Sequence, residues 1–254
     1  AGFRKLPEIL ASLERRSFFK PWLQEFYQQS FTQSAIAVLC RELFHLPKEL
    51  KASMLQDAQD YLSKDNDLTE QEKLFLYLLE KYPGDSGALF AFLLNYQQLK
   101  PGEALFLQPG IVHAYLQGDA IECMAASDNV VRAGLTQKKL LPNIFLETAD
   151  FSQDILKIDK GLKTEDEGRV YKSDAREFKI RTFHGQNFNF AKLSEVAGIL
   201  LILKGSATLN SENGEAIKAE KGSSWLRPAA MKNAKLTADS KETVAVYCEF
   251  NYSS

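Results

Sequence analysis

The segment from Gln108 to Lys138 reads QPGIVHAYLQGDAIECMAASDNVVRAGLTQK, and it decides the fold class of this part of the chain. Gly, Pro, Asp and Asn separate short apolar runs, a rhythm typical of all-β structure. With the run just upstream, the expected short strands are 104–107, 114–116, 120–125 and 130–132. The same segment gathers a His, carboxylates, an Arg and a Lys, a mixture that is poor core material and typical of an active site.

The first 80 residues instead predict helices, because apolar side chains recur there at helical spacing. Residues 69–72 resemble a capping box before the apolar run at 74–76. Residues 86–99 read either as a short helix or as another buried element. The helices expected before them cover 7–13, 18–31, 35–44, 50–62 and 71–81.

The β rhythm resumes in the last third of the chain, after a linker with an early strand at 141–170. Asn213-Gly214 is a strong two-residue hairpin signal, and the run 198–203 reads as a fully buried strand. Further strands are expected at 178–183, 207–209 and 243–250. This succession predicts a small jelly-roll barrel.

The fold class we predict from these patterns is mainly β with an α-helical domain, and its β parts are jelly-roll barrels. The composition changes near 82 and near 150, so the expected parts are a helical domain at 1–81, a β part at 82–149 and a second β domain at 150–254.

Composition narrows the function classes. The 254 residues carry a formal net charge of −2, which gives no general attraction to nucleic acid or to an anionic membrane. Three cysteines far apart in sequence argue against a disulfide framework and for a reducing, cytoplasmic compartment. No apolar run reaches the length of a membrane-spanning helix. Phosphate-binding loops, dinucleotide-binding glycine motifs and nucleophile elbows are absent from the sequence.

Two residues of the opening segment have side chains suited to acid–base or metal chemistry. His113 is either a metal ligand or general base, or a histidine satisfied by its neighbours at a barrel mouth. Glu122 stands within an otherwise apolar run, so it faces either a polar cavity or the solvent. His45 and His184 lie far away in sequence, and we do not expect either to be a ligand.

Three further residues carry charge near the end of the segment. Arg132, between small residues, suits the recognition of a planar anion or a developing enediolate. Asp128 is equally natural in a plain turn, and Lys138 either binds phosphate or is simply solvated.

These residues and their spacing resemble the type I phosphomannose isomerases, zinc-dependent cupin enzymes. The resemblance covers nearly the whole chain, and its most specific part lies between about 82 and 140. The matching segments are Gly2-Phe3-Arg4, Pro7-Glu8-Ile9, Tyr82-Pro-Gly-Asp85, 99–107, His113-Ala-Tyr115, Gly118-Asp119, 121–125 and 127–136.

The resemblance implies that the enzyme interconverts mannose 6-phosphate and fructose 6-phosphate through a cis-enediol, as part of carbohydrate metabolism and GDP-mannose biosynthesis. It implies zinc as cofactor and His113 as a metal ligand. It also implies Arg132, Glu122 and Asp128 as catalytic residues, and Tyr115 and Lys138 as substrate-binding residues. Which of these groups is the base stays open.

In the resembling family the other zinc ligands precede the Gly-Phe-Arg motif, which here begins at Gly2. We therefore expect this chain to be a C-terminal portion, nearly inactive alone, with strands in 82–140 that lack barrel partners. The N-terminal part of the same enzyme would be its partner, besides the sugar phosphate. The resemblance implies that 1–81 is a helical domain and that 82–149 is the C-terminal part of a catalytic cupin barrel, which would be incomplete here. It implies that 150–254 is a C-terminal cupin-like β domain. The alternatives are a non-catalytic sugar-phosphate-binding cupin and an isomerase of another sugar phosphate.

Overall fold

The computed structural model describes residues 1–251 apart from 30–33, 128, 165–167, 172, 186, 190–195, 211–213 and 232–234. By its internal packing the chain divides into two compact units. The first comprises 1–98, 107–117 and 129–157, and the second comprises 99–106, 118–128 and 158–254. The domain boundaries expected from the sequence follow a different criterion and stay predictions.

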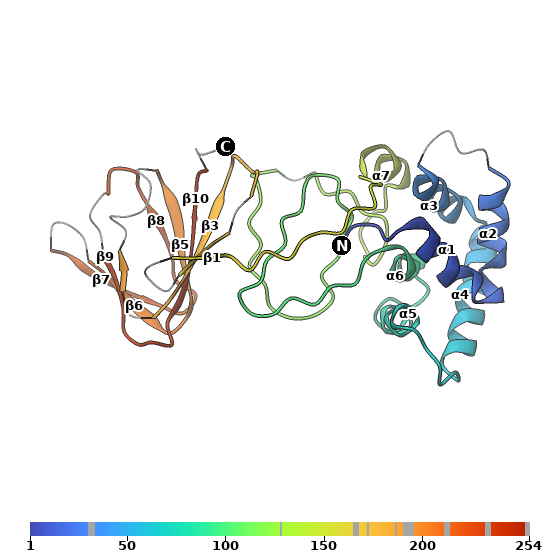
Figure 1. The fold of residues 1–254 in the computed structure, drawn as a ribbon, viewed down its shortest axis with the longest axis horizontal. Helices are drawn as coiled ribbons and strands as arrows, with labels where there is room; N and C mark the ends of the chain where they lie inside the picture. Colours follow the sequence, from blue (N-terminus) through green and yellow to red (C-terminus); the bar gives the residue numbers. More distant parts are fainter. Residues whose placement is uncertain are drawn as a thin grey trace. The chain divides into compact units, whose positions relative to one another are not determined.

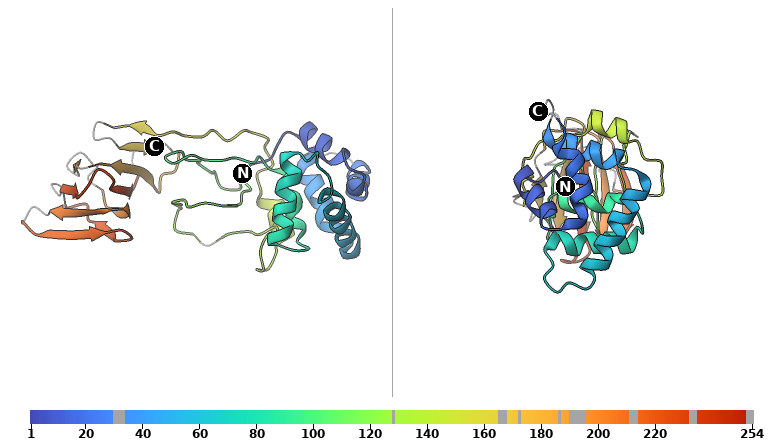
Figure 2. Two further views of the ribbon diagram at one scale, coloured as in Figure 1. Left: turned by 90° about the horizontal axis from the view of Figure 1, so that it is seen from below. Right: turned by 90° about the vertical axis from the view of Figure 1, so that its right-hand side faces the viewer.

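The first unit is a helical bundle, shown in Figure 1 and from two further sides in Figure 2. Of the helices expected in the first 80 residues, the one over 18–31 ends at Tyr27, and 30–31 lie outside the described residues. The others are confirmed, and a short helix follows in the ambiguous stretch at 86–99. The bounds are α1 (Leu6–Glu14), η1 (Ser17–Phe19), α2 (Lys20–Tyr27), α3 (Ala35–His45), α4 (Lys48–Leu62), α5 (Glu70–Lys81), η2 (Ser86–Leu89) and α6 (Phe90–Leu93).

Aromatic side chains fill the centre of this bundle. The ring of Phe92 lies 5.0 Å from that of Phe19 and 5.4 Å from that of Phe75, measured between centroids. Trp22 is fully buried, and its indole N–H donates to the Leu39 carbonyl at 2.9 Å, so its one polar group is satisfied. The core therefore ties α2, α3, α5 and α6 into one body, which gives the short segment 86–93 a rigid base.

A buried ion pair joins the start of α5 to the end of α1. The predicted capping box is confirmed: Thr69 and Glu72 bond to each other's backbone N–H groups. Glu72 is 1% exposed and also accepts from Arg16 Nε at 2.5 Å. Burial alone would raise the pKa of Glu72, but the hydrogen bonds from Arg16 and from Thr69 outweigh burial and lower it.

This lowered pKa makes a prediction for stability against pH. Because folding depresses the pKa of Glu72, its stabilisation is present above the unfolded value of about 4.3 and is lost as pH falls through the folded value. We expect Glu72→Gln to cost about 2 kcal/mol at neutral pH and to flatten the acid limb of the unfolding free energy. Chemical denaturation at several pH values measures both effects.

Glu70→Gln is the matched control, since Glu70 lies on the same helical turn but is exposed and pairs only with Lys73. An acid limb equally steep in the Glu72→Gln variant and in the wild type would contradict this account.

A seventh helix, α7 (Pro142–Thr148), corrects the sequence analysis, which expected a linker with an early strand at 141–170. Proline at the first helical position is favourable because its missing N–H is not needed there. Phe145 packs edge-on against Phe44 at 5.6 Å and against Phe90 at 5.9 Å. Tertiary packing of one aromatic residue thus stabilises a helix too short to show clear periodicity.

The strands expected at 104–107, 114–116, 120–125 and 130–132 are not formed among the described residues. The β-bridges that the described residues of this stretch form are isolated ones, at Ala104 with Asp159 and at Ile111 with Asp150. Several apolar side chains here are exposed, including Tyr115 at 65% and Met124 at 59%. A strand needs a hydrogen-bonded neighbour, so strand-like sequence without a paired strand stays extended and irregular.

The second unit contains two antiparallel sheets, ordered β1-β2-β3-β10-β5-β8 and β4-β9-β6-β7. Their bounds are β1 (Leu162–Lys163), β2 (Arg169–Tyr171), β3 (Lys179–His184), β4 (Asn187–Asn189), β5 (Gly198–Lys204), β6 (Ser206–Asn210), β7 (Ala216–Glu220), β8 (Ser224–Arg227), β9 (Lys235–Ala238) and β10 (Val244–Glu249). The predicted fold class, mainly β with an α-helical domain, is confirmed.

The burial of β5 differs from its prediction. β5 was expected to be fully buried, but its burial alternates: Leu200 and Ile202 are buried, whereas Ile199 is 55% exposed. An antiparallel sheet needs only one face on a core, so the other face of an apolar strand can meet solvent. The predicted hairpin between β6 and β7 exists, but Asn213 of its turn lies outside the described residues.

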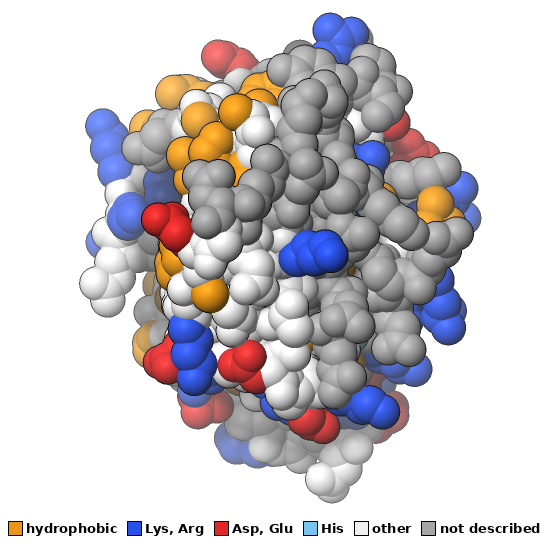
Figure 3. Space-filling view, turned by 90° about the vertical axis from the view of Figure 1, so that its left-hand side faces the viewer, with side chains coloured by type: hydrophobic (Ala, Val, Ile, Leu, Met, Phe, Trp, Pro, Cys, Tyr) orange, Lys and Arg blue, Asp and Glu red, His pale blue; other side chains and the backbone are white. Residues whose placement is uncertain are grey.

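The described side chains on the face drawn in Figure 3 show Lys and Arg interspersed with Asp and Glu. This mixture, like the small net charge, gives no large field of one sign there. None of the helices in the described part of the chain combines the length and the hydrophobicity that crossing a bilayer requires.

Candidate functional site

The backbone just before His113 is held from two sides, both within the first unit. The Gly2 N–H donates to the Val112 carbonyl at 2.8 Å, and the Asp150 N–H donates to the Gly110 carbonyl at 2.9 Å. Gly110 has φ +88°, and a Cβ there would lie 2.9 Å from the carbonyl oxygen of residue 148, so glycine is required. These hydrogen bonds to the N-terminal residues and to the end of α7 therefore fix the backbone position from which the His113 side chain extends.

The His113 ring is exposed, and one hydrogen bond settles which nitrogen carries its proton. Nδ1 lies 2.8 Å from the carbonyl oxygen of Ile111. A carbonyl can only accept, so Nδ1 of the neutral ring donates and Nε2 keeps its lone pair. Metal-binding histidines are commonly oriented by such a bond from the non-ligating nitrogen. The ring centroid of Tyr115 lies 5.6 Å away, edge-on.

Arg132 and Lys138 lie on a loop that is locked to the helical bundle by Asp85. One carboxylate oxygen of Asp85 accepts from the Gly87 N–H at 2.7 Å, and the other accepts from the Thr136 N–H at 3.3 Å. The backbones cross so closely that a Cβ on Gly134 would lie 2.5 Å from Gly87 Cα. Glycine on both sides is therefore a steric requirement of this crossing.

Leu135, next to the crossing, has φ +56°, a left-handed conformation that costs energy for a residue with a Cβ. The neighbouring contacts hold it there. This crossing was not predicted from the sequence, although two features of the sequence point to it: an Asp follows a Pro-Gly pair, and two glycines stand in otherwise apolar surroundings.

The side chains carried by this loop differ in exposure. Arg132 is half-buried, its carbonyl accepts from the Leu141 N–H at 3.1 Å, and its guanidinium donates to the Val130 carbonyl at 3.4 Å. Lys138 is exposed, and its backbone N–H donates to the Thr136 hydroxyl at 3.2 Å. The arginine is thus the better fixed of the two cations.

The structure gathers only part of the predicted site into one unit. His113, Tyr115, Arg132 and Lys138 belong to the first unit, whereas the exposed Glu122 belongs to the second. Asp128 lies outside the described residues. That Glu122 and Asp128 act together with the other four stays a prediction.

The described residues include no group of three or more His, Cys, Asp or Glu side chains that could hold a metal ion. His45, at the end of α3, and His184, at the end of β3, are both exposed. The described part of the chain therefore offers His113 as a single well-oriented ligand and not a complete zinc site, which needs three or four ligands.

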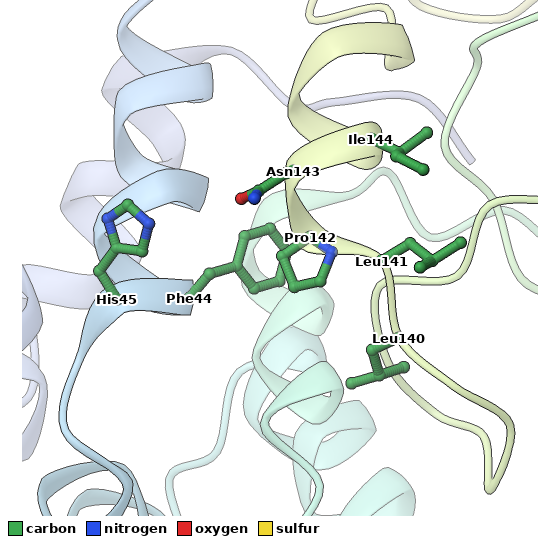
Figure 4. A pocket seen from close by; sticks show the side chains of 7 residues that line it. All are labelled: Phe44, His45, Leu140, Leu141, Pro142, Asn143 and Ile144. Carbon is green, nitrogen blue, oxygen red and sulfur yellow. The ribbon is translucent and has the colours of Figure 1, made fainter.

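A pocket of about 490 Å³ lies elsewhere in the first unit, between the end of α3 and the start of α7 (Figure 4). Phe44 and Pro142 are among its lining residues, and His45 is its one titratable side chain. None of the predicted site residues lines it, so it does not help to assign the chemistry.

Comparison with solved structures defines the class of protein. The chain matches a crystal structure of phosphomannose isomerase from Salmonella typhimurium with a TM-score of 0.80 and 25% identity, over 98% of this chain and 63% of that one. A zinc-bound structure of mannose 6-phosphate isomerase matches equally, with a TM-score of 0.80, 25% identity and coverage of 98% and 62%. The fold is thus that of the cupin-type sugar-phosphate isomerases.

Sequence comparison gives the family. A probable mannose-6-phosphate isomerase from Dictyostelium discoideum is 33% identical over 97% of this chain and 57% of its own length. One from Caenorhabditis elegans is 31% identical over 82% of this chain and 53% of its own. No protein-family model matches the chain. The chain belongs to the mannose-6-phosphate isomerase family, and it spans a little over half the length of these relatives.

The Asp85 lock makes a testable prediction. We expect Asp85→Ala to speed amide hydrogen exchange at Thr136 and its neighbours, because the amides of Gly87 and Thr136 lose their acceptors. Exchange in the core of α2 and α3 should stay unchanged. Asp154→Asn, at an exposed carboxylate, is the control. Unaltered protection of 134–138 in Asp85→Ala would show that the carboxylate does not hold this loop.

Proposed function

We propose that this chain is part of a zinc-dependent isomerase that interconverts mannose 6-phosphate and fructose 6-phosphate. The observation that carries the proposal is the oriented ring of His113, whose Nε2 lone pair is left available for a metal. It stands within a chain that is 33% identical to a probable mannose-6-phosphate isomerase over 97% of its length. A Salmonella structure of the same fold is described as bound to fructose 6-phosphate and zinc.

The donor chemistry of His113 fits zinc, which prefers nitrogen, sulfur and carboxylate ligands. His113 would be one ligand, and the others would come from polypeptide outside these 254 residues. The support is that no second set of ligands occurs among the described residues and that the relatives are longer than the matched region. When bound, zinc supplies a Lewis acid that polarises the sugar oxygens.

Two residues of this chain would carry the chemical step: one would transfer the proton, and the other would stabilise the negative charge that develops on the substrate. Glu122 would take the proton from the carbon next to the carbonyl and return it to the neighbouring carbon, passing through a cis-enediol. The guanidinium of Arg132 would stabilise the negative oxygen of the enediolate. Its carbonyl and guanidinium bonds hold it in place for this role.

The remaining residues would bind and orient the sugar phosphate. Lys138 would pair with the phosphate as an exposed cation, and Tyr115 would lie against the sugar beside His113. Asp128 would complete the catalytic set.

We further propose that 82–149 belongs to a catalytic cupin barrel that is completed by the same outside polypeptide. Residues 1–81 would be its helical domain and 150–254 a C-terminal cupin-like domain without catalytic residues. The enzyme would act in the cytoplasm. Tyr115 and Met124 are exposed and belong to segments outside the regular strands, which supports a barrel that needs further strands.

Complementation tests the function. The chain alone should bind less than one zinc per molecule and show no isomerase turnover. Added to the portion of the Dictyostelium relative that the match leaves uncovered, it should bind one zinc per chain and interconvert the two sugar phosphates. Native mass spectrometry measures the metal and the complex, and a coupled assay measures turnover. Stoichiometric zinc with turnover by the chain alone would contradict the proposed division of ligands.

Binding of sugar phosphate without turnover in the complemented complex would favour the non-catalytic alternative. Turnover of a different aldose 6-phosphate, but not of mannose 6-phosphate, would favour another isomerase.

Variants in the complemented complex test the roles. We expect Arg132→Ala to lower kcat by about 100- to 1,000-fold, because it removes one group that stabilises developing charge. Lys138→Ala should raise KM for mannose 6-phosphate with a smaller change in kcat. Lys139→Ala is its matched control, since Lys139 is the exposed lysine next to it. Equal KM values for the two lysine variants would contradict the assignment of Lys138.

A further inference from the structure

Two cysteines that are far apart in the sequence meet in the second unit. The Sγ atoms of Cys123 and Cys248 lie 3.0 Å apart, although 125 positions separate the residues. Both side chains are partly exposed, and both are free thiols in this structure. A disulfide bond has an S–S length of about 2.05 Å, so closing the pair needs a movement of only about 1 Å.

The two partners differ in how firmly the backbone holds them. Cys248 is the next-to-last residue of β10, and it is paired on one side with Ile180 and on the other with Ile199. Cys123 lies on the extended segment 118–128, which forms no regular strand among its described residues. The strand therefore holds the sulfur of Cys248 in place, and the segment that carries Cys123 can move its sulfur the short distance toward it.

The hydrogen bond between the thiols prepares one of them to react. Either sulfur can donate in this contact. The hydrogen bond with Cys123 lowers the pKa of Cys248, while the same bond raises the pKa of Cys123. The thiolate is the reactive form of cysteine, so Cys248 is the sulfur that attacks first.

We propose that Cys123 and Cys248 are a redox-active pair that forms a reversible disulfide with hydrogen peroxide as oxidant. The Cys248 sulfur attacks one peroxide oxygen and breaks the O–O bond, giving a sulfenic acid and one water. The Cys123 sulfur then attacks Cys248 Sγ, the S–S bond forms, and the second water leaves. Two thiols lose two protons and two electrons, and one peroxide is reduced to two waters.

A metal is the competing reading of two neighbouring thiols, and the geometry disfavours it. Zinc–sulfur bonds of about 2.3 Å in a tetrahedral site hold two sulfurs about 3.8 Å apart. The observed separation is 3.0 Å, and the described residues offer no third His, Cys, Asp or Glu ligand beside the pair.

The disulfide would tie the segment that carries Glu122 to the C-terminal sheet. Cys123 directly follows Glu122, so oxidation would fix the backbone next to this residue to β10. The ring closed by the bond spans the chain from 123 to 248, and a bond that closes so long a loop removes much freedom from the unfolded chain. The redox pair requires nothing of the proposed isomerase activity.

The chain itself serves for the test, and its third cysteine is an internal control. Cys40 is fully buried in α3, and burial raises the pKa of its thiol, so it should not react in the folded protein. After equimolar hydrogen peroxide, the intact mass should fall by two hydrogens. Non-reducing peptide mapping should recover a peptide that links Cys123 to Cys248, and dithiothreitol should restore both thiols.

Cys123→Ser and Cys248→Ser should each lose the internal crosslink, whereas Cys40→Ser should keep it. Circular dichroism before oxidation confirms that each variant is folded. The proposal is overturned if peroxide-treated wild-type chain keeps Cys123 and Cys248 open to alkylation. It is also overturned if the chain gains oxygen at either sulfur without a crosslink, or forms only disulfides between molecules.

Discussion

The crossing of two glycines is the constraint on which the candidate site depends. Gly87 and Gly134 pass with no room for a Cβ on either, and the carboxylate of Asp85 bonds to the backbone on both sides. Gly87 lies in the buried run 87–93 that the aromatic core holds in place. These contacts with the helical bundle therefore fix the position of the loop that carries Arg132, although that loop has no regular secondary structure of its own.

The elements that could be predicted from the sequence are those stabilised by residues close to one another in the chain. The helices of the first 80 residues follow from apolar spacing and caps, and Thr69 with Glu72 caps α5 in the predicted way. Helix α7 was missed because its seven residues are held by Phe145 packing on Phe44 and Phe90. His113 was singled out by residue type, but its tautomer depends on a bond to Ile111 that no pattern reveals.

What the sequence could not predict depends on partners distant in the chain. The runs between 104 and 132 have strand-like composition, but strands form only where a neighbour supplies hydrogen bonds, and here they stay extended. Wide spacing of the cysteines argued against a disulfide framework, yet spacing says nothing about distance across a sheet, and Cys123 meets Cys248. The residue types of a site made of such segments can be recognised in the sequence. The distances between these residues can be known only from the folded structure.

The central claim is that His113 offers its Nε2 lone pair as a metal ligand because Ile111 holds the proton on Nδ1. Nitrogen-15 NMR of the histidine side chains, with His113 assigned by its loss in His113→Gln, reads this tautomer directly at neutral pH. The account predicts a proton on Nδ1 and, on addition of zinc to the complemented complex, a change confined to Nε2. A proton on Nε2 of His113 in the metal-free chain would contradict it.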